Sequence, residues 1–207
     1  LCRDFSQMTY CMGNMTEPES VSTVLGEQNY LIPTVIGKLN NSDEWCIGDD
    51  AVLRGKREES VNASDIIKAI LAEKSIDIGD EKITGHEVMR VYFSGLFKIL
   101  STNYHITRPD NIVITVEYPD RILVNLIRNV LLEMEFDKNK IKIIGHSESL
   151  IYYTIFQKKE IWVNDVLVFD FTNNQFLVRR LNTVRARVPQ PIIVEEMDLS
   201  QKFKIGM

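Results

Sequence analysis

The second half of the chain alternates apolar strand-like runs with amphipathic helical patterns, and this order constrains the fold more than any other feature. The segment 111–119 contains the apolar run IVITV and precedes a helical pattern over 120–136. A second strand-like run at 140–146 precedes a helical pattern over 147–159, and a third occupies 164–171. Apolar strands joined through helices are typical of α/β folds with buried parallel strands. We therefore expect an α/β fold in which the first two strands are parallel neighbours.

Capping signals indicate where the helices begin. Thr84 and Glu87 have the spacing of a capping box, and the apolar residues after them recur with the helical period. We expect an earlier helix, over 62–74, to be capped by Asn62 or Ser64. The expected N-caps of the two later helices are Asp120 and Ser147.

The first third of the chain is rich in β-branched and aromatic residues and is punctuated by turn signals, which predicts short strands. We expect a strand over 5–12 and another over 29–39. Because proline donates no backbone hydrogen bond, Pro33 makes the second an edge strand or one that bends. The segment 44–52 is expected to be a short strand that turns into a helix.

Composition excludes some classes of function. The 207 residues carry a formal net charge of -5, which argues against non-specific nucleic-acid binding. No apolar run approaches the ~20 residues of a membrane span. Three cysteines without a C-x-x-C pair favour a reducing, cytoplasmic location, so the N-x-S/T sequons at Asn14 and Asn62 are expected to be chance matches. His86 and His105 lack partners at metal-ligand spacing.

The end of the chain has the pattern of an antiparallel hairpin. Asn173 and Asn174 separate the strand 164–171 from a long strand-like run, and asparagine tolerates the positive φ of tight turns. A further strand is expected over 191–198. Arginines of the long strand would either grip an acidic partner or a polyphosphate, or pair across the sheet with acidic residues of the last strand. These residues are Arg179, Arg185 and Arg187, with Glu195, Glu196 and Asp198 opposite.

Five segments resemble the first lobe of the actin, heat-shock-chaperone and sugar-kinase ATPase superfamily. The segment 1–11, LCRDFSQMTYC, resembles its first phosphate hairpin, and 31–37, LIPTVIG, resembles the strand after it. The segment 45–55, WCIGDDAVLRG, is similar to the W-IGDEA segment of bacterial actins. Finally, 112–136 resembles the VITVP strand with its helix, and 166–181, VLVFDFTNNQFLVRRL, resembles the second phosphate hairpin.

The resemblance implies a ribonuclease-H-like mixed sheet flanked by helices. Residues 1–162 would form the first lobe, with a small α/β insertion at about 38–83. Residues 163–207 would be the opening β-hairpin and strands of a second lobe, which the full-length chain is expected to complete. Sequence upstream of Leu1 is also expected. The family further implies a bacterial-type cytoplasmic protein.

The resemblance also implies which residues would serve ATP and Mg²⁺. Arg3 and Ser6 of the first loop would meet the phosphates, as would Asn173 and Asn174 of the second. Asp170 matches the family carboxylate that holds Mg²⁺ through water. Two of them have a structural alternative: Ser6 as a strand residue, and Asp170 as a strand-end residue that caps the hairpin turn.

The start of the interlobe helix is where the family orients the attacking water, and here it contains His146 and Glu148. His146 could act on water as a base, and Glu148 could share a catalytic role. The alternative is that His146 is a loop residue near a helix N-terminus and that Glu148 interacts favourably with the helix dipole.

The chain departs from the family where the chemistry lies. Phosphate loops use glycine because backbone amides must close on the phosphates without an intervening Cβ. No two of the ten glycines are closer than six residues, and neither predicted phosphate loop contains one. Asp4, next to Arg3, would repel a phosphate. These departures argue against catalysis.

We therefore expect an actin-like ATPase-fold module with a degenerate nucleotide site, which acts as a scaffold or interaction module through a protein partner or self-association. The alternative is an active, Mg-ATP-binding actin-like or chaperone-like ATPase that forms filaments. A ribonuclease-H-like nuclease ranks last, because that reaction needs several clustered carboxylates and only Asp4, Glu117 and Asp170 lie near predicted strand ends.

Overall fold

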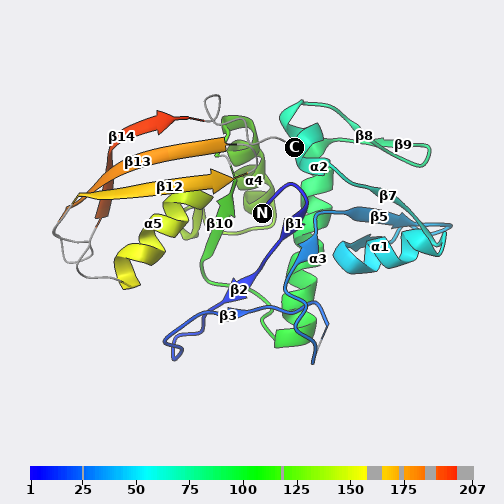
Figure 1. The fold of residues 1–207 in the computed structure, drawn as a ribbon. Helices are drawn as coiled ribbons and strands as arrows, with labels where there is room; N and C mark the ends of the chain where they lie inside the picture. Colours follow the sequence, from blue (N-terminus) through cyan, green and yellow to red (C-terminus); the bar gives the residue numbers. More distant parts are fainter. Residues whose placement is uncertain (25, 118, 158–164, 173–174, 185–189, 200–207) are drawn as a thin grey trace. The chain divides into compact units, whose positions relative to one another are not determined.

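The computed structural model shows a mixed α/β protein with several helices and small sheets (Figure 1). It forms two compact units: unit 1 comprises 1–114 and 119–143, and unit 2 comprises 115–118 and 144–207. The division into lobes at 162 stays a prediction. The structure describes residues 1–24, 26–117, 119–157, 165–172, 175–184 and 190–199.

Unit 1 begins with four short strands. β1 (Phe5–Ser6) pairs antiparallel with β4 (Ile32–Pro33), and β2 (Thr9–Tyr10) pairs with β3 (Glu19–Ser20). The expectation of one strand over 5–12 is therefore wrong. The chain changes partner at Met8, whose carbonyl accepts a hydrogen bond from the Val21 amide. The expectation of one strand over 29–39 is also wrong: β4 ends at Pro33, the chain bends at Thr34, and a separate strand, β5 (Ile36–Leu39), follows with other partners.

The middle of unit 1 contains a three-stranded antiparallel sheet covered by one helix (Figure 1). Its elements are β5 (Ile36–Leu39) between β6 (Trp45–Ile47) and β7 (Ser60–Ala63), with α1 (Gly48–Lys56) against them. The predicted turn from strand to helix at 44–52 is confirmed. Gly48 makes that turn with φ 59°, a conformation that favours glycine.

The next helix is shorter than predicted. α2 (Ile66–Leu71) begins after Asp65, which has φ 55° and makes no side-chain cap. The expected cap at Asn62 or Ser64 is wrong, because Asn62 lies in β7 opposite Gly37. A hairpin of β8 (Ile76–Ile78) and β9 (Glu81–Ile83) follows.

The two long helices of unit 1 begin where their caps predict. In α3 (Gly85–Tyr104) both bonds of the capping box between Thr84 and Glu87 are present. In α4 (Arg121–Glu133) the Asp120 carboxylate accepts from the Ile122 amide at 2.7 Å. Of the helices in the described ranges, none combines the length and apolar character needed to cross a membrane.

α4 connects two strands that are hydrogen-bonded neighbours, β10 (Ile112–Val116) and β11 (Ile141–Gly145), with the short 3-10 helix η1 (Lys138–Lys140) before the second. The prediction that these two strands are neighbours is confirmed. That they run parallel stays a prediction. The expectation that β10 is buried on both faces is wrong, because Val113 is 61% exposed although Val116 is fully buried. The described part of this sheet has two strands, which leaves side chains of β10 uncovered.

Unit 2 contains α5 (His146–Gln157) and an antiparallel sheet of β12 (Val166–Thr172), β13 (Gln175–Val184) and β14 (Gln190–Asp198). The predicted hairpin is confirmed by the pairing of Thr172 with Gln175. The N-cap at Ser147 is wrong, because the helix already includes His146.

The sheet of unit 2 is covered on one face and open on the other. Ile151 of α5 and Leu181 of β13 form a small core with Val166 and Val168. Leu167 of β12 points the other way and is 57% exposed, so the expectation of a fully buried third strand is wrong.

The predicted pairing across the last two strands is confirmed where it is described. Arg179 lies opposite Glu196, with Nε 2.5 Å from the carboxylate. Arg180, which the sequence did not single out, pairs with Glu195 on the other face. Arg185 and Arg187 lie outside the described residues.

The capping box gives a pH-dependent prediction. The backbone amide and hydroxyl of Thr84 donate to the Glu87 carboxylate at 2.8 and 2.9 Å, and these bonds lower the pKa of Glu87. The stability they supply is present above the unfolded-state pKa and is lost as pH falls through the lowered folded-state pKa. Denaturant unfolding should show Glu87→Gln less stable than wild type near neutral pH, with the difference shrinking well below that pKa.

The control is Glu17→Gln, an exposed glutamate outside any helix. It should show no comparable pH-dependent difference. A Glu87→Gln difference that stays constant over the whole range would mean that the carboxylate charge contributes nothing to the cap.

Candidate functional site

Ser6, the predicted phosphate contact in the first loop, is a buried residue of β1, with 3% of its surface exposed. The hydroxyl of Tyr92, on α3, donates to Ser6 Oγ at 2.9 Å and also lies 3.4 Å from the Pro33 carbonyl. The Ser6 and Thr34 hydroxyls are 3.5 Å apart, and that of Thr34 donates to the Cys2 carbonyl at 3.1 Å. We call Ser6, Thr34 and Tyr92 the hydroxyl cluster.

Tyr92 anchors the hydroxyl cluster to the core, and its side chain is fully buried. Burial raises the pKa of its phenol, which keeps the group protonated and able to donate. The cluster therefore joins β1 and the segment after β4 to α3 by hydrogen bonds that burial protects from water.

Arg3, the second predicted phosphate contact, is half exposed and pairs with Asp65. Its Nε and one terminal nitrogen both donate to Asp65 Oδ1, at 2.9 and 2.8 Å. Asp4 lies at the edge of ion-pair distance, 4.0 Å. The guanidinium is thus already beside two carboxylates, which disfavours a phosphate there.

The remaining predicted site residues belong to unit 2. His146 and Glu148 both lie in the first turn of α5 and are half-buried. Asp170 is a β12 residue opposite Leu177, and its side chain is outside the described part of the structure. Asn173 and Asn174 also lie outside the described residues. The proposed roles of these residues stay predictions.

Among the described residues, no group of three or more His, Cys, Asp or Glu side chains is placed to hold a metal ion. His86, at the start of α3, has its Nε2 3.1 Å from a carboxylate oxygen of Glu133 at the end of α4.

The segment that resembles W-IGDEA packs around Asn62. The Asn62 amide nitrogen donates to the Ala51 carbonyl in α1 at 2.6 Å, and the Ser60 hydroxyl donates to its oxygen at 2.8 Å. A Cβ on Gly37 or Gly55 would lie 2.3 or 2.2 Å from the Asn62 amide group, closer than atoms can approach. Asn62 is thus wedged between sheet and helix.

This wedge also bears on the sequon at Asn62. The amide nitrogen to which a glycan would attach is the one that donates to Ala51. This bond supports the expectation that the sequon at Asn62 is a chance match to the glycosylation pattern.

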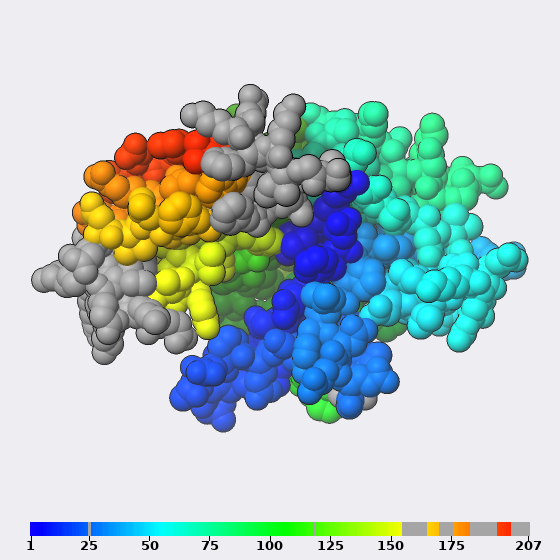
Figure 2. Space-filling view, in the orientation of Figure 1, coloured from blue at the N-terminus to red at the C-terminus, as the bar shows by residue number. Residues whose placement is uncertain are grey.

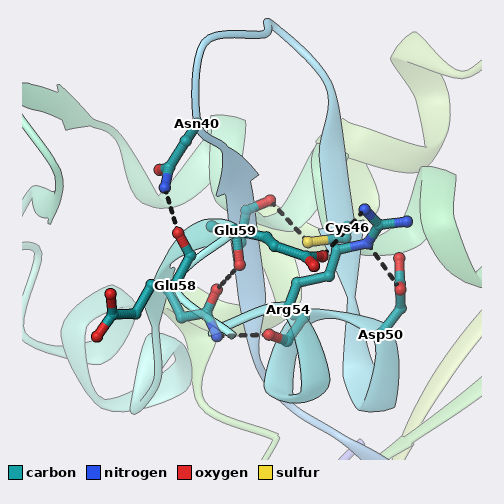
Figure 3. Close-up of polar contacts among 10 residues, drawn as sticks. Asn40, Cys46, Asp50, Arg54, Glu58 and Glu59 are labelled. Atoms are coloured by element: carbon teal, nitrogen blue, oxygen red, sulfur yellow. Dashed lines mark hydrogen bonds and ion pairs between the residues drawn. The ribbon is translucent and has the colours of Figure 1, made fainter. Parts of the chain in front are cut away.

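Helix α1 and the turns beside this sheet carry polar residues that bind one another (Figure 3). Asp50 accepts from Arg54 Nε at 2.8 Å, and Glu59 lies 3.8 Å from the same guanidinium. Asn40 donates to the Glu58 carbonyl at 2.6 Å. Burial, and next the Asp50 charge, raise the pKa of Cys46, so its thiol is a poor nucleophile. These contacts are structural.

Asp49, the first aspartate of the GDD sequence, anchors a loop. Its carboxylate accepts from the Thr23 hydroxyl at 3.1 Å and from the Asn29 amide at 2.9 Å. Sequence reasoning did not find this role, because both partners are at least 20 positions away and no local pattern marks them.

An open hollow of about 420 Å³ lies between the turn after β5 and the β8–β9 hairpin. Lys38 lies at its wall, with Nζ 2.6 Å from Glu81 and 3.4 Å from Asp43. The hydrogen bond to Glu81 is the main cause of the raised pKa of Lys38. Lys38 therefore joins the β5–β6 hairpin to the β8–β9 hairpin. The carboxylates of Glu81 and Asp43 compensate its positive charge.

Comparison with known proteins places the chain in one family. Residues 17–205 match the family described as "Family of unknown function (DUF5716) C-terminal", and the chain belongs to it. No curated protein matches the sequence.

The wedge around Asn62 predicts a stability effect. Asn62→Ala removes the donor to Ala51 and the acceptor from Ser60, so we expect it to lower the free energy of unfolding by about 1–3 kcal/mol. The matched control is Asn40→Ala, which removes a hydrogen bond on the exposed surface and should cost less. If denaturant unfolding showed equal losses of stability in the two variants, the structural role assigned to Asn62 would be contradicted.

The hydroxyl cluster predicts coupling between Ser6 and Tyr92. Ser6→Ala leaves a buried phenol without its nearest acceptor and should cost about 1–3 kcal/mol of unfolding free energy. Tyr92→Phe removes the phenol oxygen itself. In the double variant the two losses should be less than additive, because both remove the same bond. Additive losses in a double-mutant cycle would show that the bond contributes nothing.

Proposed function

We propose that this chain is an actin-like ATPase-fold module of the ribonuclease-H-like class, with a degenerate nucleotide site. In this proposal it acts as a scaffold or protein-interaction module in a bacterial-type cytoplasm. It works through contact with a protein partner or with itself, rather than through ATP hydrolysis.

The order of elements supports the fold part of the proposal. Short antiparallel strands come first, and a small α/β region with a three-stranded sheet follows. The chain then runs through β10, α4, β11 and α5 to the hairpin of β12 and β13. This is the order of the lobe that the sequence resembles, and β10 and β11 are neighbours as that lobe requires.

The observation that carries the functional part is the buried position of Ser6. A phosphate-binding hydroxyl must be free to donate to the ligand, yet Ser6 is 3% exposed and holds the Tyr92 hydroxyl. Drawing Ser6 away would leave a buried phenol poorly satisfied, at a cost of about 1–3 kcal/mol. The pairing of Arg3 with Asp65 supports the same conclusion.

The test is a calorimetric titration of the full-length protein with Mg-ATP, together with a measurement of phosphate release. We expect no binding in the micromolar range and no turnover above the rate of a buffer control. Micromolar affinity with measurable turnover would overturn the degenerate site and favour the active ATPase.

Two variants sharpen the titration. Asp170→Asn removes the carboxylate that would hold Mg²⁺ through water, and Arg3→Ala removes the charge that would meet the phosphates. In the degenerate module both variants should give the same nucleotide titration as wild type. A loss of binding in either variant would show that the corresponding residue serves a nucleotide.

A further inference from the structure

The connection between β2 and β3 carries three sulfur-containing side chains within five residues. Cys11, Met12 and Met15 lie in the sequence CMGNM, and together with Met8 they form the densest group of sulfur side chains in the sequence. Figure 2 shows this hairpin at the molecular surface, in blue at the lower left. We call Cys11, Met12 and Met15 the sulfur turn.

The side chains of the sulfur turn are accessible from solvent. Cys11 is exposed and forms no disulfide, and Met12 is 46% exposed although methionine is usually a buried residue. Met15 is half-buried. A Cβ added at Gly13 would meet no atom within 4 Å, so the space over this part of the turn is open. Core packing therefore does not explain Cys11 and Met12, and an ion can reach them.

The backbone brings the three residues together. The Met15 amide donates to the Met12 carbonyl at 2.9 Å, which closes a four-residue turn over Gly13 and Asn14. In such a turn the Cα atoms of the first and last residues lie within about 7 Å. Cys11 directly precedes the first of them, so all three residues lie at one end of the turn.

Contacts of the sulfur atoms show where they lie. The Met12 amide donates to Met15 Sδ at 3.2 Å, so the thioether of Met15 reaches back across the turn. Cys11 Sγ lies 3.7 Å from the Met12 carbonyl and 3.9 Å from the Met15 carbonyl. Two of the three sulfur atoms thus lie against the backbone of Met12, the residue that carries the third. Hydrogen bonds of sulfur are weak, so a metal ion can replace them at little cost.

This combination of ligands selects a soft metal ion. Cysteine and methionine sulfur favour copper(I), whereas calcium and magnesium need oxygen ligands. A structural zinc site needs four Cys, His, Asp or Glu ligands, and the described ranges contain no suitable group of even three. The segment 8–20 contains no lysine, arginine or histidine, so no positive charge of the hairpin itself opposes a cation.

We propose that the sulfur turn binds one copper(I) ion through the sulfur atoms of Cys11, Met12 and Met15. On binding, the Cys11 thiol loses its proton to solvent and its sulfur forms a bond to the metal, while each thioether donates a lone pair. The copper is in the +1 state before and after binding, so no oxidant or reductant is consumed.

The copper site goes beyond the proposed function and does not depend on the nucleotide site. The predicted phosphate contacts Arg3 and Ser6 lie outside the sulfur turn, and their side chains contact Asp65 and Tyr92. Failure of one proposal therefore leaves the other standing.

The test is a titration of the full chain with copper(I), in the presence of a reductant and without oxygen, in competition with a coloured copper(I) chelator. Wild type should withdraw one copper ion per chain from the chelator. Cys11→Ser, Met12→Leu and Met15→Leu should each weaken binding by about tenfold or more, because losing even a residue that supports a metal ligand costs about 10–100-fold.

Two control variants remove sulfur outside the turn. Cys2→Ser removes a half-buried thiol, and Met197→Leu removes a thioether that is 48% exposed, close to the exposure of Met12. Neither should change the copper affinity or the stoichiometry. Leucine keeps most of the volume of methionine, and circular dichroism checks that every variant is folded.

Three results of this titration would overturn the proposal. If the chelator keeps all of its copper, the sulfur turn does not bind the ion. If only Cys11→Ser weakens binding, the thiol acts alone and the three-sulfur site is wrong. If either control weakens binding as much as the turn variants do, the copper lies elsewhere.

X-ray absorption of the copper-loaded chain tests the ligands themselves. The copper should have only sulfur neighbours, and their number should fall by one in Met15→Leu. Nitrogen or oxygen neighbours in wild type, or an unchanged sulfur count in Met15→Leu, would refute the ligand set.

Discussion

The hydrogen bond from Tyr92 to Ser6 is the interaction on which the rest of the N-terminal region depends. It joins residues 86 positions apart, and it ties the first strand to the longest helix of unit 1. β1 and β4 are each two residues long, so their own ladder supplies few bonds. A buried phenol that donates to a buried hydroxyl adds a directional link that water does not compete for.

The same link supports the proposal that the first loop is structural rather than a nucleotide site. A nucleotide site and a structural cluster would need the same hydroxyl for different purposes. In the structure Ser6 serves Tyr92, Arg3 serves Asp65 and Thr34 serves the Cys2 carbonyl. These three side chains already have partners within the protein, which supports the proposal of a degenerate nucleotide site.

Local signals in the sequence predicted local structure well. The capping box of Thr84 and Glu87, the cap at Asp120 and the hairpin after β12 all depend on residues within a few positions of one another. The failed caps at Asn62 and Ser147 show the limit of such signals. Asparagine is a common N-cap residue, but the β5–β7 ladder and the bond to the Ala51 carbonyl place Asn62 in a strand.

The candidate site was less predictable because its contacts are distant in sequence. Arg3 and Asp65 are 62 positions apart, and no periodic pattern joins them. The resemblance identified the loop in which Arg3 and Ser6 lie, but it could not show that both are already bound. The exposure of Leu167 could not be predicted for a different reason. An apolar run is typical of a buried strand, but which face of the strand is covered depends on the elements that pack against it.

Hydrogen exchange of the amides of residues 1–6, with and without Mg-ATP, tests the central claim most directly. A first loop held by Tyr92 and Asp65 should exchange at the same rates in both conditions, because the Ser6 and Arg3 side chains are already bound within the protein. Slower exchange of these amides that depends on Mg-ATP would show that the loop closes on phosphates, and would contradict the account.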